Sequence, residues 1–412
     1  MKRLSILSFL VMFLIGTDTF LISPMLPVLS RTMRFPPAQG GWLVSAYAIG
    51  YCMSALVVGP ISDRLNRRNV LIAGFALFAC ATAACGFARG FWVLLALRFV
   101  TGLCASIGSP QIWAIIPQLV PGERVAAVMA APTAGLTVST LLGVPIGSFL
   151  SATSTSMPFF AVGGCALVMV VVLMVMFPAV ADAPTIPDAS RGSGALVHAA
   201  ESDGGRALGV TDRVHALIGA LIGSYRKLFS NPRSMRYFLA YLLFQTGNFA
   251  IMTFIATWFA KDFGLDQVGI GWAVMIIGVG NTLGAVAGPW VMARVSHGRM
   301  LLGGFCVYIG LYAILALSVN ITMACSLLFV TYMVSGAVFP LFIERLQSLT
   351  VAQRGTVSTL TNVTMYAGST LAGIVGGPLM ACVPGFWGVT VFVLAMMCAS
   401  LALWARSGAH DF

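Results

Sequence analysis

Charged side chains are scarce in this chain of 412 residues. Only 8% of its residues are Asp, Glu, Lys or Arg, against roughly 25% in an average soluble domain. Acidic residues are the rarer of the two charge types, with 12 in total against 23 basic residues. Such a chain lacks the polar surface that a water-soluble protein needs. Its 59% hydrophobic content and mean hydropathy of +0.95 indicate a protein that is solvated by lipid.

Several kinds of catalytic and metal site are also missing from the sequence. None of the nine cysteines forms a Cys-x2-Cys pair, and most lie inside apolar runs, so we interpret them as packing residues. The four histidines, His198, His215, His297 and His410, fall in loops, in a linker or in the tail. We find no Ser/His/Asp set and no phosphate-binding loop. The sequence therefore predicts no enzyme, no metal site and no bound cofactor.

Long apolar runs fill most of the chain, and about 20 apolar residues suffice to cross a bilayer as a helix. Twelve runs have this character: 4–28, 41–61, 70–88, 91–116, 127–150, 158–178, 237–260, 267–293, 300–318, 322–343, 355–380 and 386–405. The first run is too long for the apolar region of a signal peptide, and no Ala-x-Ala site follows it. We therefore expect it to be the first transmembrane helix.

These runs predict an all-α membrane protein with twelve transmembrane helices. We expect one six-helix bundle over residues 1–178 and a second over 237–412. The segment between them, 179–236, contains Pro, Gly, Ser and Asp and predicts a cytoplasmic linker. Within it, residues 210–229 are compatible with a helix on the membrane surface and equally with a solvated linker helix.

The basic residues predict the orientation of the chain in the membrane. Four of them, Arg31, Arg34, Arg89 and Lys261, fall on one side, Arg98 lies inside a run, and the other 18 fall on the side of the N-terminus. Because positive charge favours the cytoplasmic side, we expect both termini and the linker to lie in the cytoplasm. This also accounts for the net charge of +11 without a nucleic-acid partner. We expect the protein itself to lie in a bacterial-type inner membrane. We expect a monomer.

The two halves of the sequence repeat each other. At an offset of 230 positions, Trp42 falls on Trp272 and Pro110 on Pro340, and several glycines also coincide. Each copy contains six spans, so both copies enter the membrane in the same direction. The result is a parallel repeat about an axis along the membrane normal.

Two charged residues lie well inside the apolar runs, where a charge costs at least about 2.5–3.5 kcal/mol. Asp18 is nine residues from Pro27, or roughly 13 Å, and Arg98 is seven residues from Phe91, or roughly 10 Å. Their similar depth predicts that they can pair. The pair is either a static link between the first and fourth helices or a proton-coupling site at which the carboxylate binds and releases a proton.

Neutral polar residues occupy the corresponding region of the second half, where Asn248 is the repeat mate of Asp18. A single helix face would carry Tyr241, Gln245, Asn248 and Met252, and other spans add Asn281, Asn362 and Tyr366. These residues either line a substrate cavity or form hydrogen bonds between helices.

The loop between the second and third spans combines one acid with several arginines. Its candidate gating residues are Gly59, Asp63, Arg64, Arg67 and Arg68. The loop is either an ordinary positively charged cytoplasmic loop or a gate in which Asp63 accepts hydrogen bonds from a helix N-terminus.

These motifs resemble those of the major facilitator superfamily, and in particular its twelve-helix drug/proton antiporters. The 59–68 loop is similar to the signature Gly-x-x-x-Asp-Arg-x-x-Arg-Arg, and residues 97–102 are similar to the fourth-helix motif whose arginine, here Arg98, is implicated in proton coupling. Asp18, with Pro24 and the Leu-Pro pair that ends at Pro27, resembles the first-helix motif of many exporters.

The fifth span resembles the antiporter motif but departs from it. From Gly135 onward it is similar to the motif, yet it contains Gly143, Pro145 and Gly147 in the order Gly-Val-Pro-Ile-Gly where drug exporters have Gly-Pro-x-x-Gly-Gly. That variant is similar to the branch of sugar, nucleoside and chloramphenicol-type exporters.

The resemblance implies a proton-coupled exporter of small, fairly apolar molecules that works by rocking its two halves. A proton on Asp18 would then compete with the substrate, Arg98 would modulate the exchange, and the proton would be the coupling ion. One alternative is the export of an endogenous sugar, nucleoside or amino acid. A non-transporting membrane sensor is the other.

Overall fold

The computed structural model describes residues 2–62, 65–178, 231–292, 294–349 and 354–406. Within these ranges the chain is helical and contains no strand. The first half comprises α1 (Lys2–Met33), α2 (Pro37–Ser62), α3 (Arg67–Cys85), α4 (Phe91–Leu119), α5 (Gly122–Val138), the π-helix η1 (Ser139–Gly143), α6 (Val144–Thr153) and α7 (Met157–Met176). The second half comprises α10 (Pro232–Asp262), α11 (Gln267–Met292), α12 (His297–Leu315), α13 (Ile321–Gln347), α14 (Arg354–Cys382) and α15 (Trp387–Ala405).

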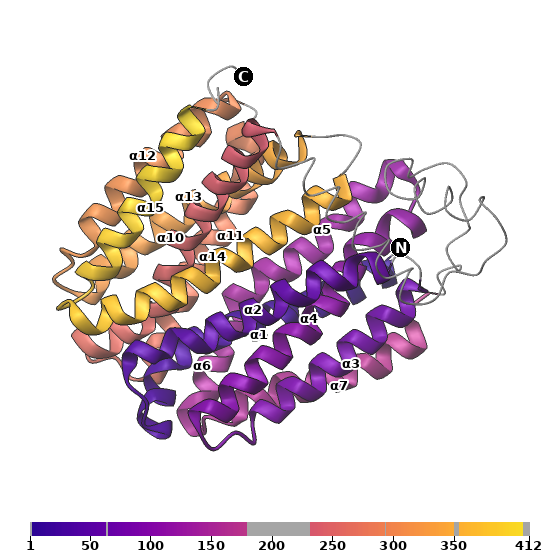
Figure 1. The fold of residues 1–412 in the computed structure, drawn as a ribbon, viewed down its shortest axis with the longest axis horizontal. Coiled ribbons are helices and arrows are strands. Elements are labelled where there is room, and N and C mark those ends of the chain that lie inside the picture. The colour runs from indigo at the N-terminus through magenta and orange to yellow at the C-terminus, as the bar shows by residue number, and fades with distance from the viewer. Residues whose placement is uncertain (1, 63–64, 179–230, 293, 350–353, 407–412) are drawn as a thin grey trace, which may run out of the picture.

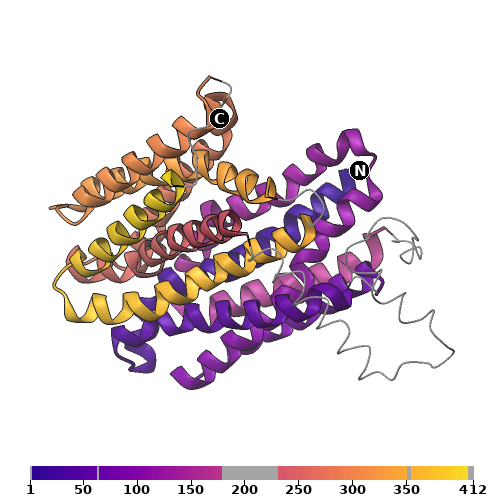
Figure 2. The ribbon, with the colours of Figure 1, turned by 45° about the horizontal axis from the view of Figure 1, so that its top comes forward.

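Twelve helical spans in the described residues are long and apolar enough to cross a membrane, with α5, η1 and α6 joined into one span. This confirms the predicted all-α architecture of two six-helix repeats. Figures 1 and 2 show the first half, indigo to pink, packed beside the second half, red to yellow. We call the side on which α1 begins and α15 ends the terminal face, and the side on which α1 ends the opposite face.

Helix α10 begins at Pro232, so residues 232–236 belong to a helix although the sequence assigned them to the linker. The Asn231 side chain caps this helix by accepting a hydrogen bond from the backbone N–H of Arg233 (3.0 Å). Proline at the first helical position needs no N–H partner. Hydropathy missed this first turn because its charged residues interrupt the apolar pattern. The expected helix at 210–229 lies outside the described residues.

The fifth span is interrupted by η1, which the sequence pattern did not predict. Pro145 has no N–H to offer the carbonyl of Leu141, so the regular ladder of hydrogen bonds cannot continue through this turn. The Val144 N–H instead reaches back five residues to the carbonyl of Ser139. One-turn π-segments of this kind occur inside α-helices, frequently at functional sites.

Backbone-to-backbone packing joins the two halves near the opposite face. A Cβ added to Gly41 of α2 would collide with the carbonyl of Gly373 in α14, and one added to Gly377 would collide with the carbonyl of Ala38. The Ser45 hydroxyl donates across the same seam to the carbonyl of Thr370 (2.8 Å). Helices of a membrane protein approach this closely only where small residues allow it.

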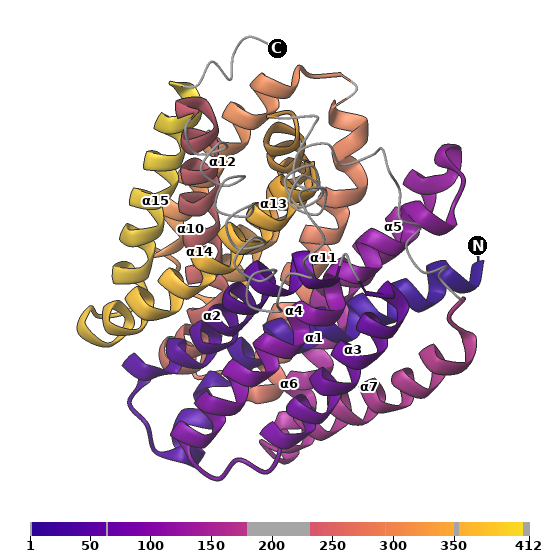
Figure 3. The ribbon, with the colours of Figure 1, turned by 45° about the vertical axis from the view of Figure 1, so that its right-hand side comes forward.

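Helix α11 makes a second contact between the two halves, with α1 and α6. The Gln267 amide donates to the carbonyl of Pro24 (2.8 Å) and to the Ser148 hydroxyl (2.9 Å). The Ser148 hydroxyl in turn donates to the carbonyl of Gln267 (3.0 Å). Along α2 the contacts with α14 continue to Cys52, whose thiol lies 3.4 Å from the carbonyl of Val363. In Figure 3 the ribbons of the two halves spread apart from this seam toward the terminal face.

We predict that Gly41→Ala weakens the seam. The added methyl group overlaps the Gly373 carbonyl, and overpacking of this kind costs about 1–3 kcal/mol. The measurement is the free energy of unfolding of the purified protein in detergent. Gly164→Ala is the matched control, because a Cβ at Gly164 on α7 meets open space. Equal stability of both variants would contradict the prediction.

Candidate functional site

An ion pair lies in the middle of the first half. Arg98 of α4 donates from Nη1 to Oδ2 of Asp18 in α1 at 2.9 Å, and from Nη2 to the backbone carbonyl of Asp18 at 3.2 Å. Both side chains are fully buried. The second carboxylate oxygen, Oδ1, has no hydrogen-bond partner among the described residues. The two side chains thus meet, as their similar depth suggested, and one carboxylate oxygen is not bound by Arg98.

Tyr47 of α2 holds the guanidinium of Arg98 from a second side. The Arg98 Cζ atom lies 4.5 Å from the centre of the Tyr47 ring, a cation–π distance. The Tyr47 hydroxyl lies 3.0 Å from that of Thr19, which itself donates to the carbonyl of Ile15 (2.8 Å). Tyr47 is therefore the donor to Thr19, and its ring orientation is fixed beside the ion pair.

Close contact with the fifth span determines where Asp18 sits. A Cβ on Gly143 would collide with Thr17, and a Cβ on Gly16 would collide with Ser139. These contacts come from η1, so the interrupted turn is the part of the fifth span that packs on α1 beside the carboxylate. Gly135 contacts Phe9 of α1 and Gly147 contacts Leu21 of α1 in the same way. Pro145, the remaining predicted motif residue of this span, lies in α6, just after the π-turn.

A layer of tyrosines connects the ion pair to the second half. The Tyr366 ring of α14 stacks on Tyr51 of α2, with centroids 3.9 Å apart, and also lies 6.2 Å from the Tyr47 ring. The Tyr51 hydroxyl is within 2.9 Å of the Ser109 hydroxyl in α4. Sequence reasoning selected Tyr366 but missed Tyr47 and Tyr51. Their spacing of four residues in one span, which places both on one helix face, was the available signal.

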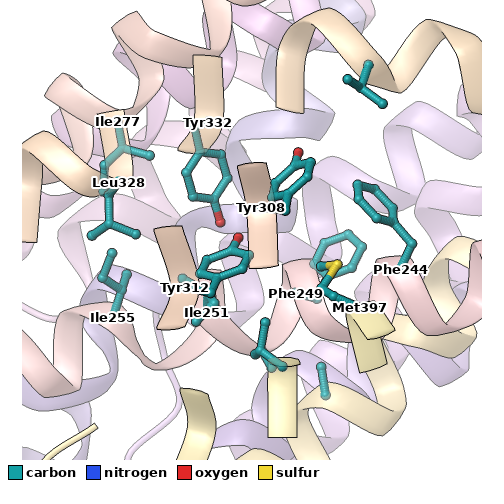
Figure 4. Close-up of a cluster of buried hydrophobic side chains, with 14 of the residues drawn as sticks. Phe244, Phe249, Ile251, Ile255, Ile277, Tyr308, Tyr312, Leu328, Tyr332 and Met397 are labelled. Carbon is teal, nitrogen blue, oxygen red and sulfur yellow. The ribbon is translucent and has the colours of Figure 1, made fainter. Parts of the chain in front are cut away.

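The corresponding place in the second half holds an uncharged core. The repeat mates of Arg98 and Tyr47 are Leu328 and Ile277, which both belong to the buried hydrophobic cluster of the second half (Figure 4). Nearby, the hydroxyl groups of Tyr312 and Tyr332 face each other. The repeat therefore keeps the scaffold of the ion-pair region and replaces its two charged side chains by the amide of Asn248 and the aliphatic chain of Leu328.

The residues that were predicted to line a cavity differ in their surroundings. Tyr241 is 1% exposed and packs against Phe342 in the core of the second half, away from the seam. Gln245 is buried against Gly368 of α14. Asn248, Met252, Asn281 and Asn362 are all partly buried. Among the seven predicted residues, Tyr366 is the one with ring contacts to the tyrosines beside the ion pair.

The predicted gating loop is described in part. Gly59 lies near the end of α2, while Asp63 and Arg64 lie outside the described residues. Arg67 begins α3, and Arg68 donates to the carbonyls of Phe177 (3.2 Å) and Met174 (2.7 Å) at the end of α7. The α3 N-terminus is capped by Asn66, whose side chain accepts from the N–H groups of Arg68 and Asn69.

The family model described as Major Facilitator Superfamily matches residues 8–373. The chain belongs to this superfamily. It is 36% identical over 398 residues to an uncharacterized MFS-type transporter, YceJ, of Bacillus subtilis, covering 97% of this chain and 94% of that protein. It is 26% identical over 324 residues to the 4-hydroxybenzoate transporter PcaK of Pseudomonas aeruginosa, covering 76% and 70%. Its relatives are transporters, so this member of the superfamily is a secondary transporter and not an enzyme.

Two solved structures share this major facilitator fold. A bacterial homolog of the human lysosomal transporter Spinster, in an inward-facing and occupied conformation, superposes with a TM-score of 0.75 at 15% identity, covering 98% of this chain and 96% of that one. A D-xylose-proton symporter superposes with a TM-score of 0.73 at 15% identity, covering 99% of both chains. At these identities the likeness concerns the fold alone.

We predict that the two charges depend on each other for stability. Arg98→Leu leaves a buried carboxylate without its partner and is expected to cost about 3–5 kcal/mol. Asp18→Asn combined with Arg98→Leu copies the residues that the second half carries, Asn248 and Leu328, and is expected to recover most of that loss. The measurement is the thermal unfolding of the purified parent protein, Arg98→Leu and the double variant, which gives their order of stability.

The exposed cation Lys261 provides the control, since Lys261→Ala is expected to change stability by no more than about 0.5 kcal/mol. If the double variant is no more stable than Arg98→Leu alone, the two charges are not coupled.

Proposed function

We propose that this protein is a proton-coupled transporter of small aromatic or apolar molecules that works by alternating access between its two halves. The observation that carries the proposal is the fully buried Asp18–Arg98 pair, in which one carboxylate oxygen has no partner among the described residues. A membrane protein retains buried charge at considerable cost, and such residues usually belong to ion or proton pathways.

The geometry suggests how a proton would be coupled to a substrate. Protonation of Asp18 removes the countercharge of Arg98, which leaves a buried cation beside the tyrosine layer. An anionic substrate would compensate that cation and would travel with the proton. A neutral or cationic substrate would compete with the proton for the same region and would travel against it. The charge of the substrate thus determines the direction of coupling.

We propose that the terminal face is cytoplasmic, as the distribution of basic residues predicts. In this orientation the seam at Gly41, Gly373 and Gln267 would close the external side, and the substrate would enter from the cytoplasm. Rocking of the halves would open this seam and close the terminal face. We expect the protein to act as a monomer in a bacterial-type inner membrane.

Export of drug-like molecules is the first candidate, in line with the antiporter-like fifth span. The observation that favours it is the packing of Gly135, Gly143 and Gly147 along α1 on both sides of Asp18. A substrate-driven shift of this span against α1 would alter the surroundings of the carboxylate directly. Export of an endogenous sugar, nucleoside or amino acid, which the fifth-span variant suggests, would use the same mechanism with a polar substrate.

Symport of an aromatic acid with a proton is the second candidate. It is favoured by the tyrosine layer of Tyr47, Tyr51 and Tyr366 next to the Arg98 guanidinium, a combination suited to an aromatic ring that carries a carboxylate. The name of one relative specifies 4-hydroxybenzoate, and a relative from Pseudomonas putida, 24% identical over 312 residues, is named a gallate transporter.

We predict that Asp18→Asn abolishes transport driven by a pH gradient, because the amide cannot take up and release the proton. The variant also leaves the buried Arg98 cation without its partner and is expected to lose stability, so transport is measured on protein that purifies in folded form. Substrate accumulation in proteoliposomes with an imposed pH gradient is the measurement. Glu344→Gln is the matched control, since this carboxylate is 61% exposed near the terminal face and should be dispensable. Unaltered gradient-driven accumulation in Asp18→Asn would remove the mechanism.

The direction of coupling separates the two candidates. An antiporter is expected to accumulate the aromatic cation ethidium in vesicles with an acidic interior. A symporter is expected to accelerate the accumulation of 4-hydroxybenzoate in vesicles with an alkaline interior. Protein-free vesicles and the Asp18→Asn protein give the passive rates. Transport that is independent of the pH gradient in both assays would exclude proton coupling altogether.

A further inference from the structure

The outer surface of the second half carries an apolar groove of about 460 Å³ between α11 and α13, close to the opposite face. Leu265, Trp272 and Ile321 line it, and the Trp272 side chain is 55% exposed. Thr322 and Ser326 belong to the same lining and lie one helical turn apart on α13, so their hydroxyl groups share one wall.

The equivalent surface of the first half is filled by aromatic side chains. Trp42 of α2 is covered by Phe91 and Trp92 of α4, with ring centroids 6.4 and 6.3 Å away. Phe35 packs on Phe91 at 4.7 Å and completes the cluster. Trp42 is consequently only partly exposed.

At the repeat offset of 230 residues the tryptophan is retained and its cover is lost. Trp42 corresponds to Trp272, while Phe35, Phe91 and Trp92 correspond to Leu265, Ile321 and Thr322. The second half therefore keeps the aromatic floor, removes three rings and adds a hydroxyl group. Because the backbone of the repeat is shared, the first half shows which shape fits this groove: flat aromatic rings packed against a tryptophan.

We propose that the groove binds a small aromatic molecule with one polar group, taken from the interfacial layer of the bilayer. Its volume lies within the range of about 300–1,000 Å³ that is usual for small-molecule sites. The ring would pack on Trp272 as Trp92 packs on Trp42, and the polar group would form a hydrogen bond with Thr322 or Ser326. Aromatic amphiphiles concentrate at the headgroup level, where membrane tryptophans also lie.

This site is distinct from the ion pair, but it adjoins the seam between the halves. The Trp272 ring lies 5.5 Å from Phe149 of α6, so the floor of the groove continues into an inter-half contact. A bound ring would thus extend an existing aromatic cluster rather than occupy an isolated surface. The groove is a feature of the fold and of the repeat, so its ligand is independent of the substrate that the Asp18–Arg98 region serves.

Indole is the probe of choice, because it is the side chain of Trp92 as a free molecule. We expect radiolabelled indole to bind the full-length protein in lipid nanodiscs with a saturable component of one site per chain, after subtraction of partitioning into empty nanodiscs. Thr322→Trp rebuilds the ring of the first half inside the groove and is expected to weaken this binding at least 10-fold. Trp272→Leu removes the floor and should weaken it as well.

Thr322→Ser is the matched control, because it keeps the hydroxyl and leaves the groove open; its affinity should remain within about twofold of the parent. The site is supported if Thr322→Trp and Trp272→Leu both lose the saturable binding and Thr322→Ser keeps it. Indole uptake that never exceeds that of empty nanodiscs overturns the proposal. So does saturable binding that Thr322→Trp leaves unchanged.

Discussion

The cost of charge in a low-dielectric interior is the constraint on which this structure depends. Asp18 and Arg98 are tolerated together because each supplies the other's countercharge at 2.9 Å, and both side chains are fully buried. Tyr47, Thr19 and the π-turn of the fifth span are arranged around this pair. Any event that changes the charge on one partner must be answered by the other partner, by a ligand or by a movement of the helices.

The two halves are held together by contacts of another kind. Near the opposite face they consist largely of glycine against backbone, with hydrogen bonds from Ser45 and Gln267 to carbonyl groups. Because backbone carbonyl groups are present whatever the side chains, these contacts depend little on side-chain chemistry. On the proposed function, chemical selectivity would rest with the tyrosine layer deeper in the protein, to which the second half contributes Tyr366.

The sequence was sufficient for the parts governed by hydropathy and periodicity. The twelve spans, the parallel repeat and the matching depths of Asp18 and Arg98 all follow from counting residues along helices. Rotation about each helix axis was beyond such counting, which is why Tyr241 was predicted at a cavity and lies in a core. The π-turn before Pro145 was missed for a related reason, because hydropathy does not register a local change in hydrogen bonding. Tyr47 and Tyr51 were missed because their partners come from other helices.

The depth of Asp18 has an electrical consequence. The residue lies midway along α1, so a proton that reaches it from either face crosses about half of the membrane field. Moving one charge through the whole field costs about 2.3 kcal/mol per 100 mV, and half of it costs about 1 kcal/mol. Occupancy of the carboxylate by a proton would therefore respond to membrane voltage as well as to acidity, even when the transported molecule carries no charge of its own.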